Sequence, residues 1–163
     1  MLPIHIIGHG GAGKTTLIVD LVSELTRRHI RVGTLKHSSH VHELDKPGKD
    51  SHQHRTAGAG PVTMVTKNLS AVYLPRTEQT GPLQILETFY KEVDITLIEG
   101  WISGPFEKIE VFRKVLQKPP LFPVVRGVKA LVSDDGPDAG DMPVLPRNDV
   151  AAIAEFILGH IKK

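Results

Sequence analysis

Hydrophobic positions along the chain alternate between a strand-like and a helix-like spacing. Near the N-terminus, Ile4, Ile6 and Ile7 form a short apolar run that predicts a buried strand. A helix is expected over residues 14–28, because apolar side chains recur there with helical spacing, at Leu17, Ile18, Leu21, Val22 and Leu25. The same criteria predict helices at 51–57, 82–90 and 150–161, and strands at 30–36, 62–66, 71–74, 94–99, 108–113, 121–126 and 129–133.

The order of these elements favours an α/β fold. A strand–helix–strand unit at the N-terminus predicts parallel pairing, because the helix carries the chain back to the starting edge of the sheet. We therefore predict a single α/β domain over residues 1–163, with a mostly parallel sheet flanked by helices. Residues 62–74 predict a hairpin, and residues 37–60 form a polar insertion loop within the domain.

The turn between the first strand and the first helix matches the phosphate-binding loop (P-loop, Walker A) pattern, Gly8-x4-Gly13-Lys14-Thr15. Glycines let successive backbone N–H groups point at phosphate oxygens, and the helix N-terminus adds its positive end. In this pattern Lys14 reaches the β- and γ-phosphates, and the Thr15 hydroxyl reaches a bound Mg²⁺. We predict a P-loop NTPase domain whose nucleotide site contains Gly8, His9, Gly10, Gly11, Ala12, Gly13, Lys14, Thr15 and Thr16.

A carboxylate at the end of a neighbouring strand usually helps to hold Mg²⁺ in such proteins. The run from Asp94 to Glu99 offers two candidates. Asp94 precedes the strand and is expected at the edge remote from the phosphates, as a solvated strand start. Glu99 ends the strand, so it should lie beside the P-loop. We therefore predict Glu99, together with Thr15, as the metal-side pair.

Selection of the base requires a second polar group. A carboxylate can accept both N–H donors on the edge of guanine. Asp134 follows a late apolar run and is the candidate base reader, with Asp135 as second choice. A plain turn is the competing interpretation, because Ser, Asp and Gly dominate turns.

The polar insertion allows three interpretations. It could bind metal through its histidines, although their spacing matches no tight zinc pattern. It could lie beside the phosphates and supply charge, beginning with Lys36 and His37 at the end of the preceding strand. It could also be a solvated loop. The histidines concerned are His37, His40, His42, His52 and His54, and the other charged candidates are Lys49, Asp50 and Arg55.

Composition narrows the function classes. The chain has no cysteine, which excludes disulfides and thiolate metal sites and fits a cytoplasmic protein. A formal net charge of +2 and 5% aromatic residues argue against nucleic-acid binding. No run is long enough for a membrane span, and no secretory signal is visible at the N-terminus, so a cytoplasmic location is expected.

Three segments together resemble the MobB family, the molybdopterin-guanine dinucleotide biosynthesis proteins B. They are residues 8–16, the Lys36-His37 pair with the polar residues after it, and Leu97-Ile98-Glu99-Gly100. The polar residues are Asp45, Gly48-Lys49-Asp50-Ser51 and Ala57-Gly58-Ala59. Trp101 follows Glu-Gly where the family often has another aromatic residue.

The resemblance implies a GTP-binding accessory protein of molybdenum cofactor biosynthesis, with Mg²⁺ and weak GTPase activity. It also implies a homodimer that acts with the molybdopterin guanylyltransferase (MobA-type), with molybdopterin itself as a further candidate ligand. By the same resemblance, Lys36 and His37 join the nucleotide site. No catalytic residue is assigned, since no water-orienting Gln or arginine finger stands in a defined position.

Two other functions compete with the adapter hypothesis. One is a P-loop small-molecule kinase, in which the insertion would bind the acceptor. The other is a histidine-rich metal-delivery GTPase, in which the imidazoles would carry the metal.

Overall fold

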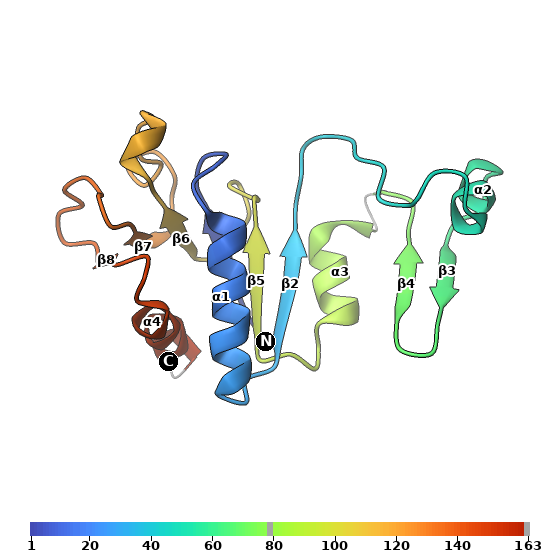
Figure 1. Ribbon diagram of the computed structural model, residues 1–163, viewed down its shortest axis with the longest axis horizontal. Coiled ribbons are helices and arrows are strands. Elements are labelled where there is room, and N and C mark those ends of the chain that lie inside the picture. The colour runs from blue at the N-terminus through green and yellow to red at the C-terminus, as the bar shows by residue number, and fades with distance from the viewer. Residues whose placement is uncertain (78–79, 162–163) are drawn as a thin grey trace. The chain divides into compact units, whose positions relative to one another are not determined.

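The computed structural model describes residues 1–77 and 80–161 and divides the chain into two compact units. One unit joins Met1–Ser38 to Tyr90–Lys163, and the other is Ser39–Phe89. The first unit contains the P-loop and the main sheet, and the second contains the polar insertion and the hairpin (Figure 1). The insertion is therefore the start of a folded unit of its own.

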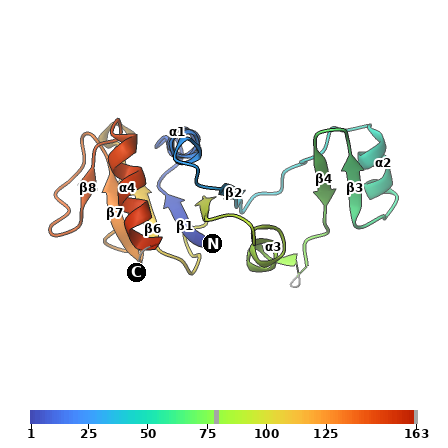
Figure 2. The ribbon, with the colours of Figure 1, turned by 90° about the horizontal axis from the view of Figure 1, so that it is seen from below.

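The main sheet has six strands in the order β2-β5-β1-β6-β7-β8, and every neighbouring pair is parallel. This confirms the predicted fold class. The strand β8 is only two residues long and lies at the outer side of β7 (Figure 2). The strand bounds are β1 Leu2–Ile7, β2 Val32–Lys36, β5 Ile95–Glu99, β6 Lys108–Val111, β7 Val128–Val132 and β8 Val144–Leu145.

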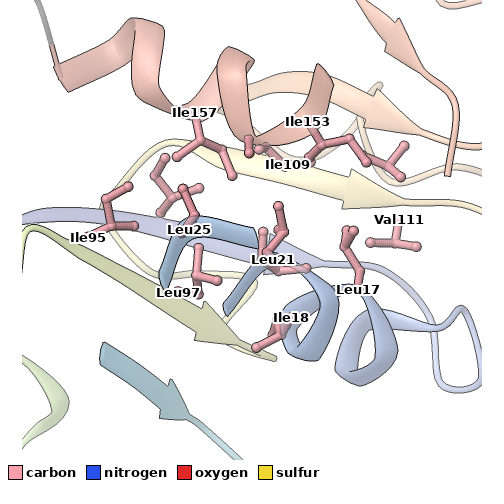
Figure 3. Close-up of a cluster of buried hydrophobic side chains, with 14 of the residues drawn as sticks. Leu17, Ile18, Leu21, Leu25, Ile95, Leu97, Ile109, Val111, Ile153 and Ile157 are labelled. Atoms are coloured by element: carbon pink, nitrogen blue, oxygen red, sulfur yellow. The ribbon is translucent and has the colours of Figure 1, made fainter. Parts of the chain in front are cut away.

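Two helices of this unit, α1 (Lys14–Arg27) and α4 (Val150–Ile161), pack against the sheet through their apolar stripes. Leu17, Leu21 and Leu25 of α1 are fully buried, as are Ile153 and Ile157 of α4. Figure 3 shows these side chains meeting residues of β5 and β6. The predicted amphipathic pattern thus formed the core, which fixes the position of α1 and hence of the P-loop before it.

The opposite side of the central strands carries several polar residues although it is buried, beside apolar ones such as Ile7 and Ile98. His5 of β1, Thr96 of β5, and Lys108 and Glu110 of β6 alternate with the apolar core residues of the same strands. His5, Thr96 and Glu110 are fully buried. Both ring nitrogens of His5 and the hydroxyl of Thr96 have no hydrogen-bond partner among the described residues.

The second unit contains α2 (Asp50–Thr56), the antiparallel hairpin β3 (Val62–Val65) and β4 (Ser70–Tyr73), and α3 (Pro82–Phe89). The hairpin lies within the predicted 62–74 segment, with β4 beginning one residue before the predicted strand, and Pro82 begins α3 as its fixed φ favours. The short helix expected in the insertion is present as α2. It packs against β3, and Ser51 is its buried residue.

The strand predicted at 121–126 is wrong. The carboxylate of Glu110 accepts the backbone N–H groups of Leu121 and Phe122, at 2.8 and 2.9 Å. The N–H groups of Val124 and Val125 then turn back onto the carbonyl of Leu121. A local turn therefore satisfies the backbone groups that a strand would have used in the sheet.

No helix of the described residues is long and apolar enough to span a membrane.

His5 predicts a pH dependence of stability. Burial, followed by the charges of Lys108 and His37, lowers its pKa from 6.5 to about 4. Below pH 6.5, His5 therefore binds a proton in the unfolded chain more readily than in the folded chain. The free energy of unfolding should be highest above pH 6.5 and should fall towards pH 4.

The measurement is urea unfolding across this pH range for the wild type, His5→Leu and the exposed control His54→Ala. The wild type and the control should lose stability together as the pH falls, while His5→Leu loses less. Equal slopes for all three proteins would contradict the assignment to His5.

Candidate functional site

The P-loop connects the last residue of β1 to the first residue of α1, as its sequence predicts (Figure 1). Gly8, Gly11 and Gly13 all have positive φ angles, of 140°, 81° and 93°. A Cβ atom on Gly8 would lie 2.3 Å from the carbonyl oxygen of Val111 in β6. Only glycine fits there, so the loop begins in direct contact with the next strand of the sheet.

Lys14 folds back over this loop. Its ammonium donates hydrogen bonds to the carbonyl oxygens of Gly8 and His9, both at 2.9 Å. Burial lowers the pKa of Lys14 and nearby Lys36 adds to that effect, while Glu99 opposes both. The ammonium of Lys14 therefore lies against the backbone at the start of the loop.

Glu99 lies where three strands end together. In the parallel register it pairs with Ile6 of β1 on one side and with Lys36 of β2 on the other. Its Oε1 accepts a hydrogen bond from the Thr15 hydroxyl at 2.9 Å and lies 3.4 Å from the Lys36 ammonium. The structure therefore brings together Thr15, Glu99 and Lys36, as expected from their strand ends.

These groups have the chemistry that a Mg²⁺ site needs. A carboxylate and a hydroxyl are hard oxygen ligands of the kind that Mg²⁺ prefers. The same carboxylate oxygen already attracts one cation, the ammonium of Lys36. Thr15 and Glu99 could thus hold Mg²⁺ beside phosphates that lie on the P-loop.

His37 and Trp101 extend this site away from the loop. Their rings stack at 5.5 Å between centroids, with 21° between the ring planes. The backbone N–H of His37 donates to the carbonyl of Glu99 at 2.9 Å. Gly100 has a φ of 82°, and a Cβ there would lie 2.7 Å from the carbonyl oxygen of His37. The Lys36-His37 pair is therefore fixed against the Glu99-Gly100 strand end.

Asp94 has a different role, at the other end of β5. It accepts hydrogen bonds from the backbone N–H and the guanidinium of Arg31 at 2.9 Å each. These hydrogen bonds lower the pKa of Asp94 to about 2. It is an ion-paired strand start rather than a simply solvated one, and it lies far along the strand from Glu99.

Asp134 and Asp135 follow β7, at the edge of the sheet where the P-loop also lies. Asp134 accepts the backbone N–H of Arg147 at 2.7 Å. Asp135 accepts the Ser133 hydroxyl and the backbone N–H of Lys114, both at 3.2 Å. Both carboxylates thus stabilise turns, and neither joins the Thr15–Glu99–Lys36 group.

The insertion is organised by a carboxylate rather than by its histidines. Oδ1 of Asp45 accepts hydrogen bonds from the Ser51 hydroxyl, the Lys46 backbone N–H and the Tyr73 hydroxyl, at 3.0, 2.8 and 3.3 Å. Burial alone would raise the pKa of Asp45, but these hydrogen bonds outweigh it and lower the pKa. Asp45 therefore links the insertion to α2 and β4.

Beside it, Arg55 of α2 binds both carboxylate oxygens of Glu43 at 2.9 Å and lies 5.2 Å from the centre of the Tyr73 ring. Lys49 precedes α2, and Asp50 is its first residue, in the turn where an acidic side chain suits the helix dipole. In the described part of the chain, no three His, Asp or Glu side chains come close enough to hold a metal ion.

Two contacts near the loop were not expected from the sequence. The ring of His9 hydrogen-bonds the carbonyl of Pro119 at 2.9 Å. Glu110 fixes the turn that follows Pro119 and Pro120, as described above. The sequence did hold a signal for the second contact. Glu110 lies within an apolar strand, and a buried carboxylate requires hydrogen-bond donors nearby.

Comparison with known proteins adds an independent observation. The sequence profile of MobB, described as molybdopterin guanine dinucleotide synthesis protein B, matches residues 3–134. The match includes the P-loop, Lys36-His37 and the Glu99 strand end. The chain belongs to the MobB family.

Two MobB relatives are named molybdopterin-guanine dinucleotide biosynthesis adapter protein. The protein from Haemophilus influenzae is 33% identical over 155 residues, which cover 94% of this chain and 86% of the relative. The protein from Escherichia coli K12 is 33% identical over 156 residues, which cover 94% and 89%.

Crystal structures of MobB proteins have the same fold. One, of a molybdopterin-guanine biosynthesis protein B, aligns over 99% of this chain and 100% of its own, with a TM-score of 0.78 and 27% identity. The Bacillus subtilis MobB structure aligns over 98% and 97%, with a TM-score of 0.78 and 19% identity. The MobB assignment confirms the resemblance and places the chain in molybdopterin-guanine dinucleotide biosynthesis; the kinase and metal-delivery hypotheses are not favoured.

Proposed function

We propose that this MobB protein is a GTP-binding adapter that acts with the molybdopterin guanylyltransferase. The observation that carries the proposal is the group formed by Lys14, Thr15, Lys36 and Glu99 at one edge of the sheet. Two cations and a Mg²⁺-type ligand pair beside a P-loop suit a nucleoside triphosphate. Capture of the guanylyltransferase by the immobilised protein tests the proposed interaction. Absence of the guanylyltransferase from the bound fraction would refute that interaction.

Each side chain has a defined task in this proposal. The backbone N–H groups of the loop and the ammonium of Lys14 bind the phosphates. Thr15 and Glu99 would hold Mg²⁺, which supplies positive charge to the phosphates when bound. Lys36 adds charge next to the terminal phosphate, and His37 holds Lys36 in place through the Glu99 backbone.

Slow hydrolysis follows from the same arrangement. Glu99 is assigned to Mg²⁺ together with Thr15, so no described carboxylate of this group is assigned to activate the attacking water. Asp134 is our candidate for the guanine edge. The N–H of Arg147 that binds Asp134 keeps its carboxylate at the end of β7.

Replacing Lys14 tests the phosphate site. Lys14→Ala removes the ammonium over the loop, so GTP affinity should fall about a hundredfold, as expected for lost charge-assisted hydrogen bonds. The exposed control Lys67→Ala should bind GTP like the wild type. Calorimetric titrations with GTP and then ATP, each with Mg²⁺, measure both affinity and base preference. Unchanged GTP binding by Lys14→Ala would refute the phosphate site, and equal affinity for ATP would refute the guanine assignment.

Glu99→Gln tests the metal role. The amide keeps the shape of the side chain but removes the charge that attracts Mg²⁺. GTP affinity with Mg²⁺ should fall about tenfold, while affinity in EDTA should change little. The same titrations with and without the chelator give both values. An equal loss under both conditions would show that Glu99 acts on the nucleotide and not through a metal.

We also infer a homodimer formed through the hairpin. Among the described residues, β3 and β4 pair only with each other, and a two-stranded sheet is barely stable alone. Four apolar side chains of the hairpin are exposed, Met64, Val65, Leu69 and Val72, with Val65 exposed to 75%. Sedimentation should show a dimer in the wild type and a monomer in Val65→Asp. A monomeric wild type at micromolar concentration would contradict this inference.

A further inference from the structure

Residues 101–107 form the loop that leaves the candidate nucleotide site and leads to the start of β6. This loop is tied to the polar side of the sheet. The buried ammonium of Lys108 donates to the carbonyls of Gly104 and Phe106, at 2.8 and 3.0 Å. The Phe106 ring stacks on that of His5, a buried residue of β1, with 5.5 Å between centroids. The loop therefore has a fixed position over the central strands.

Trp101 begins this loop and is held by contacts within it. Its ring and that of His5 are nearly perpendicular, at 85°, with 5.5 Å between centroids. A Cβ on Gly104 would lie 2.9 Å from Cδ2 of the indole, so the loop backbone packs closely against the ring. The Gly104 N–H also donates to the Trp101 carbonyl at 3.2 Å. The loop and β1 together thus fix the indole.

The indole in turn holds His37, the residue that follows β2. The two rings stack with 5.5 Å between centroids and 21° between planes. An aromatic pair of this kind stabilises its geometry beyond the effect of its buried area. The backbone of His37 is fixed as well, since its N–H donates to the carbonyl of Glu99 at 2.9 Å. His37 is therefore held both by its ring and by its backbone.

Lys36 depends on this arrangement because it directly precedes His37. Its side chain is 67% exposed, and its ammonium lies 3.4 Å from the carboxylate of Glu99. An exposed ion pair fixes a lysine only weakly, because the long side chain loses rotamer freedom when it stays in one place. A backbone that is fixed at the next residue limits the positions that the ammonium can reach. The stack on His37 thus helps to keep Lys36 beside Glu99.

We infer that Trp101 is a positioning residue of the nucleotide site. Its stack on His37 holds the end of β2 against Glu99, and so keeps the Lys36 ammonium beside the terminal phosphate. This role rests on the proposed function, because Lys36 acts there on a nucleoside triphosphate. His37 and Ser38 are also the last residues of the first unit before the chain enters the second, so the stack fixes the point from which the insertion starts.

Amide hydrogen exchange tests the stack without any nucleotide. Trp101→Leu keeps apolar volume over His5 but removes the ring face, so exchange at the His37 amide should accelerate about fivefold. The Asp94 amide is the internal control, since it donates to the carbonyl of Arg31 at the opposite end of the same two strands and should exchange as in the wild type. Trp101→Phe restores a ring and should restore most of the protection. Unchanged exchange at His37 in Trp101→Leu, or equal acceleration at Asp94, would overturn the inference.

A double-mutant cycle on GTP affinity tests the route through Lys36. With Mg²⁺, Trp101→Leu should weaken GTP binding about fivefold, and Trp101→Phe should recover most of the affinity. In a Lys36→Ala background, Trp101→Leu should cause no further loss, because the side chain that it positions is absent. The exposed aromatic control Phe89→Ala should bind GTP like the wild type. Losses that multiply in the double variant would overturn the positioning role. A wild type that binds no GTP would instead refute the proposed function, and hydrogen exchange would still decide whether Trp101 holds His37.

Discussion

The candidate nucleotide site depends on the register of three parallel strands. Because Ile6, Glu99 and Lys36 are aligned across β1, β5 and β2, the P-loop, a carboxylate and an ammonium leave the sheet at the same level. A shift of β5 by one residue would turn Glu99 to the other face of the sheet. The apolar core beneath α1 and α4 therefore has a functional as well as a stabilising effect, since it fixes that register.

The two faces of the sheet have different physical roles. On the helix side, the burial of aliphatic residues such as Leu21 and Ile153 provides the favourable free energy of folding. On the loop side, His5, Thr96, Lys108 and Glu110 are buried at a cost that hydrogen bonds only partly offset. Such groups fix particular loops in particular places: Glu110 fixes the turn at Leu121, and Lys108 fixes the loop at Gly104.

Most of the sheet and the P-loop could be predicted, because they follow from local patterns of glycine, strand ends and helical periodicity. The turn at 121–126 could not, since its apolar residues suit a strand and only the distant carboxylate of Glu110 reverses the outcome. The strand β8, of two residues, is too short for periodicity to reveal. The role of Asp45 in joining α2 to β4 also depended on contacts across the sequence, with Ser51 and Tyr73.

The hydrogen bonds of Lys14 hold the P-loop backbone in a curved conformation. Its ammonium closes the backbone between Gly8 and the first turn of α1 into a ring, through the carbonyls of Gly8 and His9. A ring of this kind limits the conformations open to the glycines, which otherwise lose the most entropy on ordering. An arriving anion would therefore meet a loop that is already curved, and only the lysine side chain would need to exchange partners.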